Sequence, residues 1–247
     1  MKIEFSCFSW PGNGPSTQKD SLLAGDFLLV ENPSPVVFNN TYEGNVVVAA
    51  VADGLEGTEK GEIAATKVLG VILEATAGSD SFDLDKTLEY GRQQLVKFET
   101  ENHLSLGTTL AGIYFDKNGA IAFNVGDGRA YKLVKGFLNQ ITRDHSVNMG
   151  EIDHEDSEFF DWPANIVTSA IVGNGENFTV FRQTISAGNG DLFLVCTDGL
   201  WSKIAIEELE EAFSPGAPSQ IAEKLLELSV PCADDNCSAV VIRILEK

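Results

Sequence analysis

The sequence predicts an α+β fold, a four-layer α-β-β-α sandwich in which two antiparallel sheets are flanked by helix pairs. About nine apolar segments with high β-propensity recur along the 247 residues, and many are joined by short turns, which is typical of antiparallel pairing. Four amphipathic segments have the spacing of helices. Nine strands are too many for one flat sheet, so we expect two packed sheets with the helices outside.

Most of the expected strands are continuous apolar runs rich in Val, Ile, Leu, Phe and Ala. They cover residues 3–9, 27–30, 46–52, 109–115, 121–125, 130–134, 179–185, 192–196 and 239–245. The segment Asp116-Lys117-Asn118-Gly119 is typical of a hairpin turn, and Asp127-Gly128 resembles a second one. The short turns favour strands that pair with their neighbours in sequence.

Each expected helix has one apolar stripe. The helices cover residues 59–76, 84–98, 206–213 and 219–230, and Ser219 is the expected N-cap of the last. Two helices side by side suit a layer that covers one face of a sheet.

We expect residues 1–247 to form a single domain, because nothing in the sequence marks a boundary. The stretch 146–165 is rich in Asp, Glu and turn formers and has no clear periodicity. Strand-like sequence resumes on both sides of it, which favours a surface flap over a linker.

The composition excludes several classes of partner. A net charge of -20 argues against binding to nucleic acid or to an anionic membrane, because both are themselves negative. No apolar run is long enough to span a bilayer, and the N-terminus lacks the layout of a signal peptide. We therefore expect a cytoplasmic protein, and a monomer.

Four aspartates lie where apolar strands end or begin. Asp53, Asp127 and Asp198 each follow a strand, and Asp235 precedes one. In antiparallel sheets, the end of one strand and the start of its neighbour lie at the same edge, so the four carboxylates can converge. Several carboxylates at one point repel one another unless a divalent cation binds there. The pattern indicates a metal-dependent enzyme.

The simpler interpretation of each Asp-Gly pair is a turn, since this dipeptide is common in turns. It fits Asp127-Gly128 best, because strands flank this pair directly. Asp53-Gly54 and Asp198-Gly199 differ, because the segments that follow them do not have the sequence of a hairpin partner. A glycine also lets its carbonyl or a metal-bound water approach closely.

Six motifs, which recur in order along nearly the whole chain, resemble those of the metal-dependent phosphatases of the protein phosphatase 2C family. They are Val51-Ala52-Asp53-Gly54-Leu55-Glu56-Gly57, Leu106-Gly107-Thr108-Thr109, Asn124-Val125-Gly126-Asp127-Gly128-Arg129-Ala130-Tyr131, Ile141-Thr142-Arg143-Asp144-His145-Ser146, Cys196-Thr197-Asp198-Gly199-Leu200-Trp201 and Asp234-Asp235-Asn236-Cys237-Ser238. The resemblance implies the same α-β-β-α sandwich, with two Mg²⁺ or Mn²⁺ ions at one sheet edge.

The resemblance also assigns roles to the aspartates. It implies that Asp53 bridges the two ions, that the carbonyl of Gly54 holds one of them, and that Asp198 and Asp235 hold the other. Asp127 matches a third, weaker metal site found near the flap in bacterial relatives. Asp53, Asp198 and Asp235 are thus the expected catalytic residues.

The implied reaction is hydrolysis of phosphoserine or phosphothreonine on a protein that a Ser/Thr kinase phosphorylates. A water bridging the two ions loses a proton and attacks phosphorus in line, while the ions neutralise the phosphate charge. Leu55 stands where animal members carry a His and many bacterial relatives carry an apolar residue. This points to a bacterial signalling phosphatase.

The first motif departs from the family. The family usually has an Arg that clamps the phosphate five residues before an Asp, and here Pro15 stands at that position before Asp20. Lys19 stands where an acidic or amide residue is common. The bidentate guanidinium is therefore missing, and Lys19 offers only a point charge from another position.

The three histidines are not expected to be catalytic. His103 and His154 lie in polar segments and are expected to be solvated. His145 is expected to anchor its loop by hydrogen bonding. The acidic run between Glu151 and Glu158 lacks the spacing and the glycine of a calcium loop.

Two other functions remain open from the sequence. The missing Arg allows a non-catalytic relative that binds a phosphoprotein or a regulatory partner. The acidic cluster alone also allows a metallohydrolase that acts on small phosphate esters.

Overall fold

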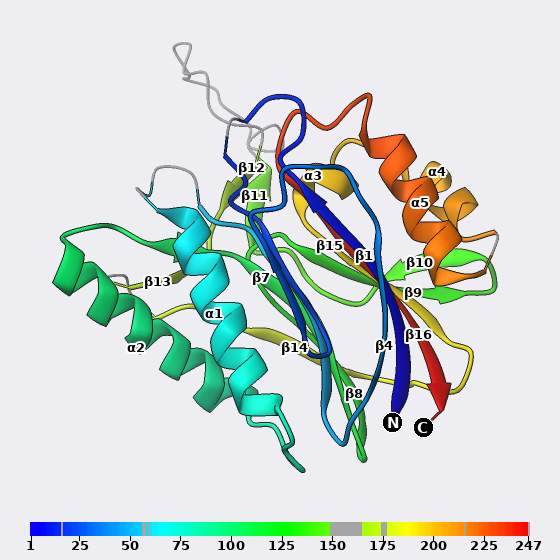
Figure 1. The fold of residues 1–247 in the computed structure, drawn as a ribbon, viewed down its shortest axis with the longest axis horizontal. Coiled ribbons are helices and arrows are strands. Elements are labelled where there is room, and N and C mark those ends of the chain that lie inside the picture. The colour runs from blue at the N-terminus through cyan, green and yellow to red at the C-terminus, as the bar shows by residue number, and fades with distance from the viewer. Residues whose placement is uncertain are drawn as a thin grey trace, which may run out of the picture.

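The structure is a computed structural model that describes residues 1–15, 17–55, 58, 60–148, 165–173, 177–214 and 216–246. Two six-stranded antiparallel sheets pack face to face, and helices cover the outer face of each (Figure 1). The predicted four-layer α-β-β-α sandwich of antiparallel sheets is confirmed.

The first sheet, called the β16 sheet, has the order β10-β9-β15-β16-β1-β4. Its strands are β10 (Phe137–Gln140), β9 (Arg129–Val134), β15 (Leu192–Cys196), β16 (Cys237–Glu246), β1 (Lys2–Trp10) and β4 (Phe38–Glu43). The helices α4 (Ile206–Ala212) and α5 (Pro218–Ser229) lie outside it, and Leu209 and Leu225 pack against Leu194 and Val241 of the sheet.

The second sheet, called the β5 sheet, has the order β14-β8-β7-β5-β2-β3. Its strands are β14 (Phe181–Ile185), β8 (Gly119–Val125), β7 (Leu110–Asp116), β5 (Val47–Ala52), β2 (Ser21–Ala24) and β3 (Phe27–Val30). The helices α1 (Gly61–Thr76) and α2 (Leu84–Asn102) lie outside it. Val68 and Leu88 of these helices pack on Val48 and Phe123 of the sheet.

A third apolar layer lies between the two sheets and joins them. Phe115 of β7 and Phe193 of β15 are fully buried there, with ring centroids 5.7 Å apart in an edge-to-face arrangement. β5 is buried along its whole length because it has the inter-sheet core on one face and α1 on the other. Its continuous run of Val and Ala reflects this position.

The predicted turn at Asp116–Gly119 is confirmed, because β7 and β8 pair through Asp116 and Gly119. The predicted hairpin at Asp127-Gly128 is wrong. β8 lies in the β5 sheet and β9 in the β16 sheet, so these two residues carry the chain from one sheet to the other. A short Asp-Gly link can form a hairpin within one sheet or connect two sheets. Which of the two occurs depends on the strands that the flanking segments pair with.

The predicted helix N-cap at Ser219 is also wrong. Ala217 is the N-cap of α5, and Pro218 is its first residue, a position that suits proline because the first helical N–H has no partner in the helix. The other predicted helices are present, although α2 runs four residues further than expected, to Asn102.

Several short elements were not predicted. They are β2, β4, β10, the four-residue helix α3 (Asp198–Trp201), the pair β6 (Gly107–Thr108) and β13 (Ile171–Val172), and the pair β11 (Ser146–Asn148) and β12 (Asn165–Val167). The pair β11 and β12 encloses the expected flap, 146–165, most of which lies outside the described residues. None of the helices in the described ranges combines the length and apolar character needed to cross a membrane.

Candidate metal centre

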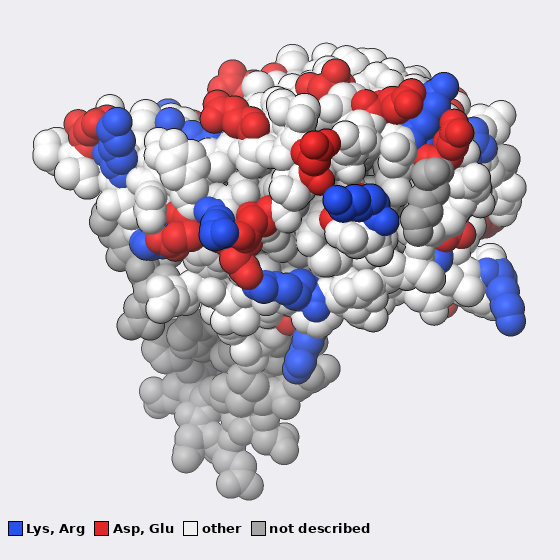
Figure 2. All heavy atoms as spheres, turned by 90° about the horizontal axis from the view of Figure 1, so that it is seen from below, with Lys and Arg blue, Asp and Glu red and all other residues white. Residues whose placement is uncertain are grey.

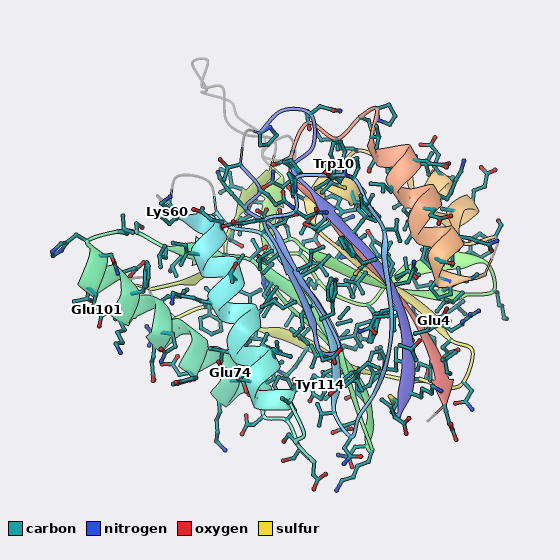
Figure 3. The ribbon with its side chains drawn as sticks, in the orientation of Figure 1. Glu4, Trp10, Lys60, Glu74, Glu101 and Tyr114 are labelled. Atoms are coloured by element: carbon teal, nitrogen blue, oxygen red, sulfur yellow. The ribbon has the colours of Figure 1, made fainter. Side chains whose placement is uncertain are left out.

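The four strand-edge aspartates lie at one end of the sandwich. β5 and β8 are both antiparallel to β7, so Asp53 and Asp127 leave the β5 sheet in the same direction. In the β16 sheet, Cys196 pairs with Ala239, so Asp198 and Asp235 also share an end. This end carries α3, and the labelled Trp10 and Lys60 lie near it in Figure 3.

The backbone around Asp53 is held by the neighbouring loop. The Asp53 carbonyl oxygen accepts hydrogen bonds from Thr108 Oγ1 and from Thr109 N, both at 2.8 Å. Leu55 N donates to the Gly107 carbonyl at 2.9 Å, and Gly54 forms a β-bridge with Thr108. The Asp53 side chain is thereby presented from a backbone that has little freedom to move.

Gly54 also lies directly against the first residue of α1. A Cβ added to Gly54 would lie 2.3 Å from the carbonyl carbon of Gly61, and one added to Gly61 would lie 2.7 Å from that of Gly54. Contacts this short are not tolerated, so both positions require glycine. The close packing fixes the Gly54 backbone against the helix.

A buried carboxylate supports the loop behind Asp53. Glu99, near the end of α2, is only 3% exposed, and its Oε1 accepts a hydrogen bond from Leu106 N at 2.7 Å. A Cβ on Gly173 would lie 2.0 Å from Glu99 Oε2. Glu99 thus connects α2 to the segment that carries Gly107 and Thr108.

The segments that carry Asp198 and Asp235 are held by backbone and by side-chain hydrogen bonds, respectively. Asp198 opens α3, and its carbonyl accepts from Ser202 N at 2.9 Å. Next to Asp235, the Asn236 amide oxygen accepts from Lys19 N at 2.5 Å, while its Nδ2 donates to the carbonyls of Pro11 and Thr17 at 3.0 and 3.1 Å. Asn236 therefore anchors the 11–19 loop, which contains Pro15.

Asp127 is part of a third network, which extends to the start of the flap. Trp201 Nε1 donates to the Asp127 carbonyl at 3.1 Å, and the Arg129 guanidinium stacks on the Trp201 ring, 3.3 Å from its centroid. Arg129 also makes a two-pronged contact with Asp144, with Nη2 to Oδ2 at 2.7 Å. The loops of Asp127 and Asp198 are thus tied together.

His145 has the anchoring role that the sequence predicts. Its Nδ1 accepts a hydrogen bond from Gly126 N at 3.1 Å, and its own N–H donates to the Gly126 carbonyl at 2.8 Å. His103 is exposed and is the left-handed C-cap of α2, with φ 56°. His154 and the acidic run Glu151–Glu158 lie outside the described residues.

The sequence reasoning did not assign Asp20 to the site. Asp20 directly precedes β2, in which Ser21 pairs with Ala52, so it lies beside Asp53. It is 1% exposed, and its Oδ2 accepts from Thr197 Oγ1 at 2.9 Å and from Ser238 Oγ at 2.7 Å. The available signal was the first motif, in which Asp20 is the aspartate that follows Pro15 by five residues.

Among the described residues, the other oxygen of Asp20 has no hydrogen-bond donor. Asp20 Oδ1 is buried without a partner, and the Asp53 carboxyl lies within hydrogen-bonding reach of Asp20. Two carboxylates make such a contact only when a proton or a cation lies between them. The orphaned oxygen therefore points to a missing positive charge.

The raised pKa values of several carboxyls also indicate that a positive charge is missing from the site. Burial raises the pKa of Asp20 to about 7 and that of Asp198 to about 7, and nearby carboxylates add to both shifts. Burial, followed by repulsion from Asp20 and Asp198, raises the pKa of Asp53 well above its ordinary value. The pKa of Asp127 is raised as well, mainly by burial. Without a cation, protons take the place of the missing charge.

One face of the surface differs from this site. On the face seen from below, acidic and basic side chains are interspersed (Figure 2). The charges that act most strongly on the buried Asp53, in contrast, are those of other carboxylates.

The donor set suits a hard divalent ion. Carboxylate and carbonyl oxygens are the ligands that Mg²⁺ and Mn²⁺ prefer, and the residues able to supply them here are Asp20, Asp53, Gly54, Asp127, Asp198 and Asp235. Within the described ranges, no three Asp, Glu, His or Cys side chains are already gathered around one point. The carboxylates lie near enough to repel one another, and an ion would draw them together.

Comparisons with known proteins agree with this geometry. The sequence profile of the protein phosphatase 2C family matches residues 37–228. The serine/threonine phosphatase stp of Listeria welshimeri is 31% identical over 195 residues, which cover 71% of this chain and 74% of that protein. The serine/threonine protein phosphatase PstP of Mycobacterium tuberculosis is 29% identical over 80% of this chain, and the match spans 40% of the length of PstP.

Solved structures show the same architecture. A crystal structure of the Mycobacterium tuberculosis phosphatase PstP covers 100% of both chains with a TM-score of 0.78 and 25% identity. A second structure, of the PstP catalytic domain in complex with two manganese ions, has a TM-score of 0.77, again at 25% identity and full coverage. With its profile match, its ordered motifs and this architecture, the chain belongs to the protein phosphatase 2C family.

Proposed function

We propose that residues 1–247 form one catalytic domain, which hydrolyses phosphoserine and phosphothreonine on proteins with the help of two Mg²⁺ or Mn²⁺ ions. The observation that carries this proposal is the repulsion of Asp53 by four other aspartates, which come from the edges of both sheets, together with an orphaned carboxylate oxygen at Asp20. Family membership supports the reaction class, and the two manganese ions in the PstP catalytic domain support the metal.

Each residue has a proposed role. Asp53 would bridge the two ions, and the Gly54 carbonyl would hold one of them. Asp198 and Asp235 would hold the other, and Asp127 would contribute to a third, weaker site. Asp20 has a raised pKa, as Asp53 and Asp198 have, and lies beside Asp53, so we add it as a residue that orients Asp53 or binds an ion itself.

The ions, when bound, would supply charge neutralisation at the phosphate and a more acidic water to attack phosphorus. The protein contributes the positions of the ligands. Thr108 and Thr109 hold the Asp53 backbone, Asn236 holds the backbone before β16, and the hydroxyls of Thr197 and Ser238 fix the Asp20 carboxylate. Fixed ligands lower the reorganisation that the reaction requires.

The expected partners are phosphoproteins that a Ser/Thr kinase modifies. The acidic surface suits a soluble enzyme of the bacterial cytoplasm, and we propose that it acts there as a monomer. Cell fractionation and light scattering test these two points independently of activity.

The first test measures hydrolysis of p-nitrophenyl phosphate and of a phosphothreonine peptide, with and without Mn²⁺. We expect turnover that requires Mn²⁺ and that Asp53→Asn largely abolishes, by on the order of 10²-fold or more, the usual loss when a catalytic electrostatic group is removed. Asp26→Asn is the matched control, because this exposed Asp lies in the turn at the other end of β2. Its activity should equal that of the parent protein.

The same measurement decides against the non-catalytic alternative. That alternative is motivated by Pro15, which cannot clamp a phosphate. If saturating Mn²⁺ gives no turnover while calorimetry shows that the ions bind, the protein is a phosphoprotein-binding relative and not an enzyme. Turnover of the small ester without turnover of the phosphopeptide would instead favour a small-molecule phosphatase.

A further inference from the structure

A lysine lies beside the carboxylates of the proposed metal centre. Lys203 follows α3, five residues after Asp198, and Nζ of Lys203 is 2.7 Å from Oδ1 of Asp234, the neighbour of Asp235. The backbone keeps Lys203 in place, because Ser202 N donates to the Asp198 carbonyl at 2.9 Å and Ile204 is buried. The ammonium contacts Asp234 directly, and Asp198 and Asp235 attract it more weakly.

The ammonium is available to an incoming anion. The Lys203 side chain is 33% exposed and its partner Asp234 is 69% exposed. Hydrogen bonding to Asp234, followed by weaker attraction to Asp198 and Asp235, keeps the pKa of Lys203 above its ordinary value. A partly exposed pair of this kind is weak and exchanges partners at little cost.

Arg129, another cation in this region, is committed to other contacts. Its guanidinium makes a two-pronged contact with Asp144, donates to the Tyr131 hydroxyl at 3.2 Å and is stacked on Trp201. It would have to break all of these contacts to reach a substrate. Lys203 would have to give up only the contact with Asp234 that the structure shows.

The position of the 11–19 loop strengthens this contrast. A Cβ on Gly14 would lie 2.3 Å from the Asp234 carbonyl oxygen, so the backbone next to Pro15 lies directly against Asp234. Pro15 itself carries no charge. Asp234 thus contacts Lys203 through its carboxylate and the Gly14 backbone through its carbonyl.

We propose that Lys203 binds the phosphoryl group of the substrate, exchanging its contact with Asp234 for a phosphate oxygen. This role rests on the proposed phosphatase function and deepens it. In a chain with a net charge of -20, a dianionic substrate needs a local cation besides the metal ions. Asp234 acts as a competing anion that the phosphate must displace.

This role and a structural one are distinguished by a pair of substitutions, because they predict opposite effects for Asp234→Asn. If Lys203 binds phosphate, Lys203→Met weakens phosphate binding, whereas Asp234→Asn frees the ammonium and strengthens it. If the ion pair only ties the loops of Asp198 and Asp235 together, both substitutions weaken binding. Lys224→Met is the matched control, because Lys224 pairs with Glu227 on the exposed side of α5 and its loss removes the same charge elsewhere.

The experiment measures kcat and KM for p-nitrophenyl phosphate, together with the dissociation constant of inorganic phosphate by calorimetry, all at saturating Mn²⁺. We expect Lys203→Met to raise KM and the phosphate dissociation constant about fivefold, the value of a partly exposed ion pair, with kcat within about twofold. Lys203→Arg should restore most of the loss. Asp234→Asn should lower both constants by about two- to fivefold.

Three results would overturn the proposal. They are unchanged phosphate binding in Lys203→Met, weaker phosphate binding in Asp234→Asn, and an effect of Lys203→Met that appears only with peptides bearing acidic flanks, which would mean that Lys203 recognises those flanks. Calorimetry with inorganic phosphate needs no turnover. A protein that binds phosphate through Lys203 and hydrolyses nothing would therefore refute the phosphatase function and leave the phosphate contact intact.

Discussion

The two halves of the candidate metal centre are held in place by different forces. Around Asp53 and Gly54 most contacts are made by backbone, with Gly54 packed against Gly61 and the Asp53 carbonyl bonded to Thr109 N, and the Thr108 hydroxyl also donates to that carbonyl. Around Asp198, Asp235 and Asp127 the contacts are made by charged and polar side chains, among them Arg129, Asn236 and Lys203.

This difference separates shape from charge. The backbone contacts of the Asp53 half should be sensitive to a single added methyl group, and only the Asp53 carboxyl in this half, whose pKa is raised, should respond to pH. The side-chain-held half, which includes the buried Asp20, should respond to protonation and to the loss of a donor. The backbone packing around Gly54 determines the position of one ion, whereas the ionised carboxylates determine how strongly the whole cluster would bind cations.

The largest expected effect is a loss of stability with rising pH in the metal-free protein. Asp20 has its pKa raised from an ordinary 3.8 to about 7, so the folded state holds a proton that the unfolded state has released. This contribution is fully present below about pH 4, falls as the pH rises to about 7 and is then constant. One such shift corresponds to on the order of 4 kcal/mol.

Thermal unfolding of the metal-free protein between pH 4 and pH 8 measures this effect, and Asp20→Asn is the comparison. The substitution should flatten the decline, because Asn carries no proton to lose. Saturating Mn²⁺ should also remove much of the decline at pH 7 to 8, since the ion replaces the proton. An equally steep decline in Asp20→Asn would show that the pH response comes from groups other than Asp20, such as Asp53 and Asp198.

Gly54→Ala should have the next largest effect, through shape. Its Cβ would lie 2.3 Å from the carbonyl carbon of Gly61, so the start of α1 or the Asp53 loop must move. We expect a loss of about 1–3 kcal/mol in the free energy of unfolding, the range for overpacking. The displaced carbonyl should weaken Mn²⁺ binding by about tenfold or more, equivalent to 1.4 kcal/mol.

Denaturant unfolding and Mn²⁺ calorimetry report these two effects separately. The pH dependence of stability should be that of the parent protein, because no titrating group has been changed. A variant that loses stability and keeps its Mn²⁺ affinity would show that the Gly54 carbonyl is not a ligand. That result would also show that the close packing of Gly54 against Gly61 does not control metal binding.

Arg129→Lys should have a smaller effect, confined to the side-chain-held half. Lysine keeps the charge and loses both the two-pronged contact with Asp144 and the flat stacking on Trp201. We expect a loss of about 1–2 kcal/mol in stability. In a Mn²⁺ titration the weakest site, which would involve Asp127, should lose affinity first, and equal weakening of every site would contradict a local role for Arg129.

The sequence predicted the strands that read as continuous apolar runs. The segments 192–196 and 27–30 match β15, which is fully buried, and β3, an edge strand that is only partly buried, at both ends. β4 was missed because Phe38–Glu43 reads FNNTYE, an edge strand whose residues alternate between half-buried and exposed. Its Asn residues have low β-propensity, and only its pairing with β1 makes it a strand.

The four strand-edge aspartates were identified from the sequence, whereas Asp20 was not, and the reason is the length of β2. Four residues are too few to show a period, so the strand that places Asp20 beside Asp53 gave no signal. The crossing from β8 to β9 at Asp127-Gly128 was missed for another reason. A local turn pattern does not say whether the next strand joins the same sheet or the facing one.

Gly70→Ala gives the smallest effect and has the opposite sign. Gly70 lies within α1, the helix whose first residue presses on Gly54, and a Cβ there would have no neighbour within 4 Å. Alanine should raise the free energy of unfolding by about 1 kcal/mol, the difference in helix propensity, with unchanged Mn²⁺ affinity by calorimetry. If Gly70→Ala shifted the Mn²⁺ affinity as Gly54→Ala does, the loop that carries Asp53 and Gly54 would respond to the stability of the whole of α1. If the affinity is unchanged, Mn²⁺ binding depends on the local contact between the backbones of Gly54 and Gly61.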